Sequence, residues 1–96
     1  MSDRFRATLH MLPTAEGGRN TPFAIKYRPQ FYVDDPNVST SLFLHNIEGC
    51  EQVSPGESAT VEASLLMPEL FGAQLASGTK FWLREVDHPV GWGVIC

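Results

Sequence analysis

Hydrophobic and polar residues alternate along several short segments of the chain, with the period of two that is typical of half-buried strands. The clearest segment is residues 5–11, whose hydrophobic positions are Phe5, Ala7, Leu9 and Met11. The same alternation recurs over residues 60–65, and the apolar segments 30–33 and 38–47 are also expected to be strands. Residues 79–86 and 90–96 flank Asp87-His88-Pro89, an arrangement that predicts a hairpin.

Turn signals separate these segments, and no sustained helical pattern occurs. Ser54-Pro55-Gly56-Glu57 combines a proline that presets φ with a glycine that accepts positive φ, which is typical of a tight turn. Residues 68–77 have room for one helical turn. Six short strands with turns at this spacing predict one all-β domain over residues 1–96, folded as a sandwich or as a closed barrel.

The charge balance argues against nucleic acid as the default partner. Seven lysine and arginine residues stand against eleven aspartate and glutamate residues, which gives a net charge of −4. A protein that neutralises phosphates needs a basic surface, because released counterions supply most of its non-specific affinity. RNA binding is therefore disfavoured, although a local basic patch would permit it.

Other functional classes have little basis in the sequence. The histidines, Cys50 and Cys96 match no zinc-ligand spacing, so no metal is expected. No constellation of nucleophile, base and acid is visible, so neither enzyme activity nor a cofactor is expected. The start Met1-Ser2-Asp3-Arg4 has no apolar stretch after it, and the apolar run 63–68 is far too short to cross a bilayer. Two cysteines form no disulfide framework, and together these features predict a cytoplasmic protein.

Ordered motifs along the chain are more specific than its composition. Residues 16–23 are EGGRNTPF and residues 27–32 are YRPQFY. They resemble EGGRHTPF and GYRPQFYF in the C-terminal β-barrel domain of bacterial translation elongation factor Tu, and residues 81–85 and 90–95 resemble the FAIREGGRTVGAGVV of that family. The resemblance spans nearly the whole chain and implies a six-stranded antiparallel barrel. It extends to no GTPase domain, and the chain has no phosphate-binding loop, so no nucleotide is expected to bind.

The resemblance also implies candidate RNA contacts, because in that family the barrel helps to hold the T-stem of aminoacyl-tRNA. Arg19 matches the arginine of the GGR motif, Ser39 stands where a threonine contacts RNA, and Glu85 matches a glutamate. Met67 and Val86, however, replace a lysine and a glycine. A phosphate contact and a close backbone approach are thereby expected to be lost.

Trp82 and Trp92 stand where the family usually has alanine. If Glu85 pairs with Val90 across the hairpin, Trp82 lies on the outer face, opposite Gly93. The inner face would then carry Phe81, Leu83, Trp92 and Val94. Two compatible roles follow for Trp82: it covers a strand glycine, or it anchors an interface with a partner.

Two functions remain open. The first is a non-catalytic interaction module that binds a protein partner or itself, as the acidic composition, the lost RNA contacts and Trp82 indicate. The second is a translation-associated RNA-binding protein in which Arg19, Ser39 and Glu85 keep their family roles. Arg19 also has a structural interpretation, in which it pairs with Glu16 or braces the barrel.

Overall fold

Strands form where the sequence alternates between hydrophobic and polar residues. The computed structural model describes residues 4–96, so the predicted absence of a secretion signal falls partly on positions outside the described residues. The strands are β1 (Phe5–Met11), β2 (Gln30–Tyr32), β3 (Thr40–Ile47), β4 (Ser58–Leu65), β5 (Lys80–Glu85) and β6 (His88–Ile95). Three single 3₁₀ turns accompany them, namely η1 (Thr14–Glu16), η2 (Pro68–Leu70) and η3 (Gly72–Gln74). The last two lie in the segment 68–77, which has room for one helical turn.

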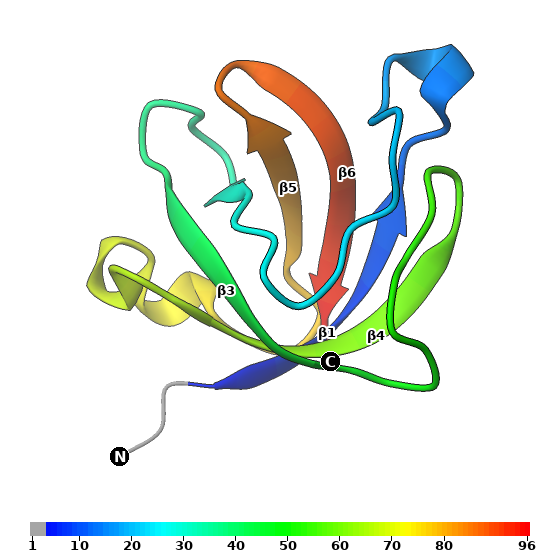
Figure 1. Ribbon diagram of the computed structural model, residues 1–96. Helices are drawn as coiled ribbons and strands as arrows, with labels where there is room; N and C mark the ends of the chain where they lie inside the picture. Colours follow the sequence, from blue (N-terminus) through cyan, green and yellow to red (C-terminus); the bar gives the residue numbers. More distant parts are fainter. Residues whose placement is uncertain (1–3) are drawn as a thin grey trace.

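The strands described in residues 4–96 close into an antiparallel barrel with the order β1-β4-β3-β2-β5-β6, and β6 pairs with β1 (Figure 1). The predicted six-stranded antiparallel barrel is therefore confirmed. Closure pairs strands that would otherwise be sheet edges, which removes the unpaired backbone groups that promote aggregation. The β5–β6 turn and η1 lie at the same end of the barrel, the upper end in Figure 1.

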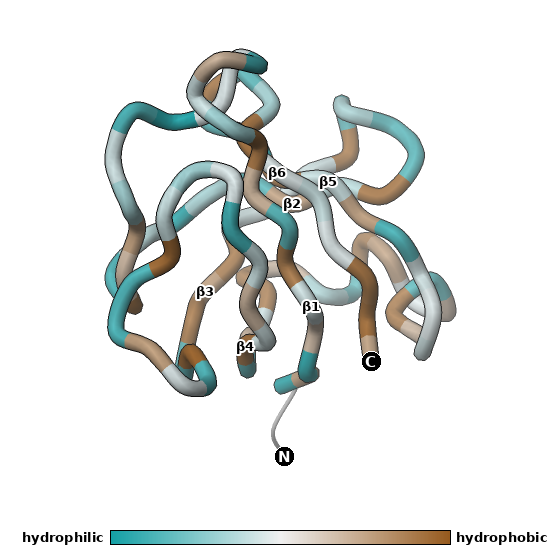
Figure 2. Tube along the Cα trace, turned by 90° about the vertical axis from the view of Figure 1, so that its right-hand side faces the viewer, coloured by the Kyte–Doolittle hydropathy of each residue, from teal (hydrophilic) through white to brown (hydrophobic). Residues whose placement is uncertain are grey.

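The hydrophobic side chains of the alternating strands fill the interior of the barrel. In Figure 2, hydrophobic positions along β1 are interrupted by polar ones, and it is the hydrophobic positions that are buried. Phe31 and Phe81 have no exposed surface, and their ring centroids lie 4.7 Å apart. Phe71, from the segment between η2 and η3, packs edge-on against Phe31 at 5.0 Å. Aromatic pairs at these separations add to the stability that burial alone provides.

The register of the β5–β6 hairpin differs from the prediction. Glu85 pairs with His88 rather than with Val90, and the register shifts between Leu83 and Arg84. Val90 is the extra residue of a β-bulge; it is fully buried, and its carbonyl accepts the N–H of Leu12 at 3.0 Å. The bulge keeps this hydrophobic side chain inside the barrel, and it changes which residues face each other along the rest of the hairpin.

Both tryptophans consequently lie on the outer face. Trp82 pairs with Trp92, whereas the prediction placed Trp92 on the inner face and Trp82 opposite Gly93. Gly93 is instead opposite the buried Phe81. The outward position of Trp82 was predicted correctly, but the interpretation that its indole covers Gly93 is wrong.

Candidate functional site

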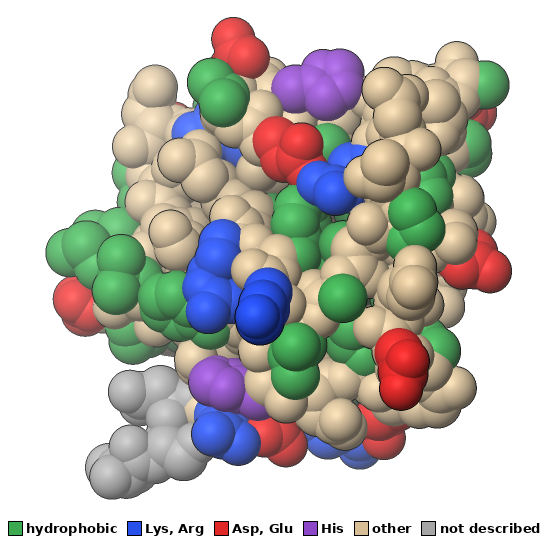
Figure 3. Space-filling model, viewed as in Figure 1, with side chains coloured by type: hydrophobic (Ala, Val, Ile, Leu, Met, Phe, Trp, Pro, Cys, Tyr) green, Lys and Arg blue, Asp and Glu red, His purple; other side chains and the backbone are tan. Residues whose placement is uncertain are grey.

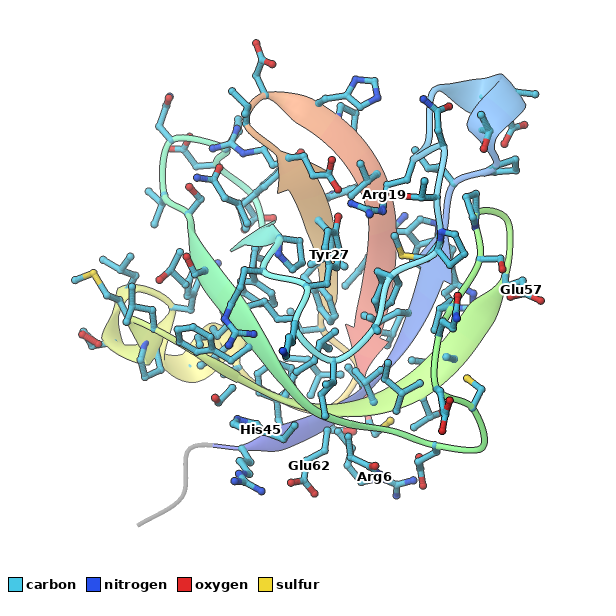
Figure 4. All side chains as sticks on the ribbon, in the orientation of Figure 1. Arg6, Arg19, Tyr27, His45, Glu57 and Glu62 are labelled. Atoms are coloured by element: carbon cyan, nitrogen blue, oxygen red, sulfur yellow. The ribbon has the colours of Figure 1, made fainter. Side chains whose placement is uncertain are left out.

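Arg19, Tyr27 and Glu85 form a compact polar group, called here the arginine cluster. Arg19 Nη1 and the Tyr27 hydroxyl both donate to Oε2 of Glu85. The guanidinium carbon of Arg19 also lies 4.3 Å from the centroid of the Tyr27 ring. Figure 4 shows Arg19 and Tyr27 close together in front of β5 and β6. Residues far apart in the sequence thus share one network of charge-assisted hydrogen bonds.

The loop after η1 fixes the position of Arg19. A Cβ atom on Gly18 would lie 2.1 Å from the carbonyl oxygen of Leu12, so only glycine permits this close approach of the backbone. Thr14 Oγ1 donates to the Arg19 carbonyl. The Arg19 side chain also donates to the carbonyl of Thr21 at 3.2 Å and to its hydroxyl at 3.1 Å. Arg19 therefore braces the barrel, and its carboxylate partner is Glu85 rather than Glu16.

A hollow of about 420 Å³ lies beside the arginine cluster. It is lined by Gly18, Arg19, Asn20, Thr21, Glu85, His88 and Val90. Figure 3 shows acidic, basic and histidine side chains gathered on this part of the surface. Nε2 of His88 donates to the carbonyl of Gly17, which ties the β5–β6 turn to the loop after η1.

Burial and hydrogen bonding have opposite effects on the pKa values of Glu85 and Arg19. Burial alone would raise the pKa of the Glu85 carboxyl, but the hydrogen bonds from Tyr27 and Arg19 outweigh it and hold that pKa below its usual value. Burial raises the pKa of the Tyr27 phenol, and the adjacent Glu85 carboxylate raises it further. Burial would lower the pKa of Arg19, but its bonds to Glu85 and Tyr27 raise that pKa instead. The cluster is therefore a stable ion pair with a neutral phenol at neutral pH.

Ser39 belongs to a separate group of side chains. Its hydroxyl accepts from Arg84 Nη2 at 3.1 Å, and Arg84 Nε donates to Oε1 of Gln30 at 3.1 Å. The guanidinium carbon of Arg84 lies 5.1 Å from the centroid of the Tyr32 ring. The structure thus brings Arg19 and Glu85 together, whereas Ser39 is bonded to a different arginine.

A comparison with known protein families accounts for this arrangement of barrel and loops. The model of the family described as the elongation factor Tu C-terminal domain matches residues 1–96. The chain belongs to this family. The closed six-stranded barrel described above is consistent with the fold of this domain, which is a non-catalytic domain in elongation factor Tu.

Two residues of the chain depart from the pattern of the elongation factor Tu C-terminal domain family, namely Met67 and Val86. Val86, in place of the family's glycine, has a φ of 57° and an exposed fraction of 83%. The loop thus keeps the positive φ that favours glycine, although a β-branched residue occupies it. Met67, in place of a lysine, is 44% exposed at the start of η2 and presents a thioether instead of a cation.

Sequence reasoning missed two features of this elongation factor Tu-like barrel. It did not identify Tyr27 as a partner of Glu85, although both belong to motifs that it singled out. It also missed the surroundings of Trp82: Lys80 Nζ lies 4.5 Å from the Trp82 ring centroid and 4.6 Å from that of Trp92. The grouping of Lys80 with the two tryptophans follows from the hairpin register. The bulge at Val90 shifts that register, so the sequence pattern alone did not reveal the grouping.

Within residues 4–96, no three His, Cys, Asp or Glu side chains gather in a way that could hold a metal ion. The same residues contain no helix that is both long and apolar enough to cross a membrane. Cys50 and Cys96 are exposed free thiols.

Replacing Glu85 by glutamine is expected to weaken the fold in a pH-dependent way. Because the pKa of Glu85 is lowered on folding, its stabilising effect is present above the unfolded pKa of about 4.3 and is lost as the pH falls through the folded pKa. The side chain is 39% exposed, so solvent screening limits the loss at pH 7 to about 1 kcal/mol. Urea unfolding of wild type and Glu85→Gln at pH 7, 4 and 3 measures both effects.

Glu62→Gln is the matched control. Glu62 is also 39% exposed and is paired with Arg4 at 2.8 Å, but it lies at the opposite end of the barrel (Figure 4). We expect this exposed pair to contribute less than about 0.5 kcal/mol. A difference between wild type and Glu85→Gln that persists unchanged at pH 3 would contradict the assigned role of Glu85.

Proposed function

We propose that this barrel is a non-catalytic interaction module of the cytoplasm that binds a protein partner or a second copy of itself. One contrast carries the proposal. Arg19, the candidate cation for RNA binding, makes its hydrogen bonds to Glu85 and Thr21 within the chain. Trp82 and Trp92 meanwhile pair on the outer face, and tryptophan is the residue type most enriched at the centre of protein interfaces.

The surface of the barrel supports a binding role in a second way. Three hydrophobic residues at the start of the β4–β5 connection are exposed, namely Leu66 (60%), Met67 (44%) and Leu70 (42%). Figure 3 shows hydrophobic side chains gathered over η2 and η3 at the left of this face. A protein partner offers these side chains an apolar environment that water does not.

A translation-associated RNA-binding function is the second candidate. One observation favours it: Arg19 and Glu85 line the same hollow, together with the backbone of Gly18. The net charge of −4 and the cation replaced at Met67 weigh against it. RNA bound through phosphates would dissociate steeply with added salt, whereas an apolar protein interface would not.

Affinity capture from a lysate of the source cell, with and without nuclease, tests the first candidate. We expect wild type to retain a protein that survives nuclease treatment, or to sediment as a dimer, and Trp82→Ala to reduce either at least tenfold. This variant should stay folded, because the cross-strand pairs of Trp82 with Trp92 and Tyr32 are worth at most about 1 kcal/mol each. Phe43→Ala is the control, since Phe43 is a half-buried outer aromatic residue of β3 that lies under Arg28 at 4.9 Å.

Two outcomes would contradict the proposal. Loss of the captured material on nuclease treatment would favour the RNA-binding function. A wild-type chain that stays monomeric at high concentration and captures no protein would exclude both a partner and self-association.

A further inference from the structure

Four aromatic or imidazole rings form a row across neighbouring strands, called here the aromatic stripe. The strand registers place His10 beside Trp92, Trp92 beside Trp82, and Trp82 beside Tyr32. The stripe thus crosses β1, β6, β5 and β2 on the outside of the barrel. The inward neighbours Phe81 and Leu83 are fully buried, whereas the stripe residues are all partly exposed. β5 and β6 lie at the back of the barrel in Figure 1.

Cations flank the stripe. Lys80 lies over both indole rings, at 4.5 and 4.6 Å, and Arg84 lies over the Tyr32 ring at 5.1 Å. His10 stacks on Trp92 with the ring centroids 4.3 Å apart. The contacts of Lys80 are with the two indole rings, so its ammonium N–H groups can still donate to an anion. Arg84 Nε and Nη2 already donate to Gln30, Ser39 and the Pro36 carbonyl, so Arg84 acts mainly through its charge.

Carboxylates are few on the four strands of the stripe, in a chain that is acidic overall. Among the described residues of β1, β2, β5 and β6, Glu85 is the only carboxylate, and it is bonded to Arg19 and Tyr27. The next acidic residues after β2 are engaged locally: Asp34 accepts from Gln74 at 3.1 Å, and Asp35 accepts from a backbone N–H at 2.9 Å. Asp34 and Asp35 keep their negative charges at this end of β2, and the cations that lie over the rings of the stripe are Lys80 and Arg84.

We infer that the aromatic stripe is the docking surface of the proposed interaction module, and that its occupant is an acidic segment of a different protein. The inference rests on the proposed function and adds the location of the site and the chemistry of the partner. Aromatic rings supply the apolar contact, and Lys80 and Arg84 supply charges complementary to carboxylates.

Charge and ring geometry distinguish this occupant from two others. A two-fold contact between copies centred on Trp82 would bring Lys80 toward its own copy, and like charges at an interface oppose association. Single-stranded nucleic acid stacks its bases on ring faces. In the stripe, Lys80, Arg84 and His10 each cover a ring face, whereas a carboxylate can approach Lys80 without displacing it.

Tryptophan fluorescence can test the inference directly, because both tryptophans of the chain lie in the stripe. The probe is a synthetic peptide that alternates glutamate and leucine, and its control is the same peptide with lysine in place of glutamate. We expect the acidic peptide alone to cause a saturable change in emission. Lys80→Glu should weaken its binding at least tenfold, with a smaller loss for Lys80→Gln. Lys26→Glu, at an exposed lysine before β2, should leave the affinity within twofold of wild type.

Several outcomes would overturn the inference. These are no emission change with the acidic peptide, equal binding of both peptides, or unchanged binding by Lys80→Glu. Tighter binding of an oligothymidylate would assign the stripe to nucleic acid, and a wild-type dimer dispersed by Trp82→Ala would assign it to a second copy. A lysate protein held equally by wild type and Lys80→Glu would overturn the inference while leaving the proposed function intact. Peptide binding that depends on Lys80, without capture of any protein, would uphold the stripe while counting against the proposed function.

Discussion

Replacing Gly93 by alanine is expected to lower the free energy of unfolding by about 3 kcal/mol. A Cβ atom at this position would lie 2.5 Å from Cζ of Phe81 and 2.8 Å from the carbonyl oxygen of Thr8. Phe81 is fully buried and packs against Phe31, so its ring cannot move without disturbing the centre of the core. The Thr8 carbonyl belongs to β1, which pairs with β6 at this point.

Urea denaturation measures this effect as a fall in the midpoint with an unchanged slope. Val94→Ala is the control on the same strand: it removes two methyl groups from a partly exposed side chain and should cost less than about 1 kcal/mol. The double variant Gly93→Ala/Phe81→Leu should lose less than the sum of the two single changes, because the smaller side chain relieves the clash. A midpoint for Gly93→Ala equal to that of wild type would show that the hairpin register described here is wrong.

Val86→Gly is expected to stabilise the barrel by about 1 kcal/mol. Val86 is the first residue of the two-residue loop between Glu85 and His88, and its φ of 57° is one that β-branched residues rarely adopt. Relief of strain worth roughly 1–3 kcal/mol exceeds the entropic cost of glycine, which is about 0.5–1 kcal/mol. The Val86 side chain is 83% exposed, so its removal loses few packing contacts.

Thermal or urea unfolding of Val86→Gly and Asp87→Gly provides a paired measurement. Asp87 is the second loop residue and does not have a positive φ, so glycine there brings only the entropic cost. We therefore expect the two variants to move the midpoint in opposite directions. A destabilised Val86→Gly would mean that the valine side chain makes contacts that outweigh its backbone strain.

Strand positions and barrel architecture could be predicted because their signals are local in sequence. The alternation over residues 5–11 buries Ala7, Leu9 and Met11 as expected. The family motifs then resolved the choice between a sandwich and a barrel. The two short 3₁₀ turns between β4 and β5 lie in the segment where the sequence has room for a helical turn.

The contacts within the candidate sites depend on features that the local pattern does not encode. A single extra residue, Val90, reversed the predicted face of Trp92 and replaced Trp82 by Phe81 opposite Gly93. Glu16, three positions away, was one carboxylate considered as a partner of Arg19, but closure of the barrel brings Glu85 to it from β5. The first difference arises from a bulge within one hairpin, and the second from contact between segments 66 positions apart in the sequence.

An NMR titration of isotope-labelled chain with a partner captured from nuclease-treated lysate tests the central claim most directly. The two indole N–H groups of Trp82 and Trp92 give separate signals that report on the outer face, and the amide of Gly18 reports on the arginine cluster. The account predicts that both indole signals shift or broaden while the Gly18 amide is unchanged. A shift of the Gly18 amide with unchanged indole signals would contradict it, because binding would then occur at the hollow beside Arg19.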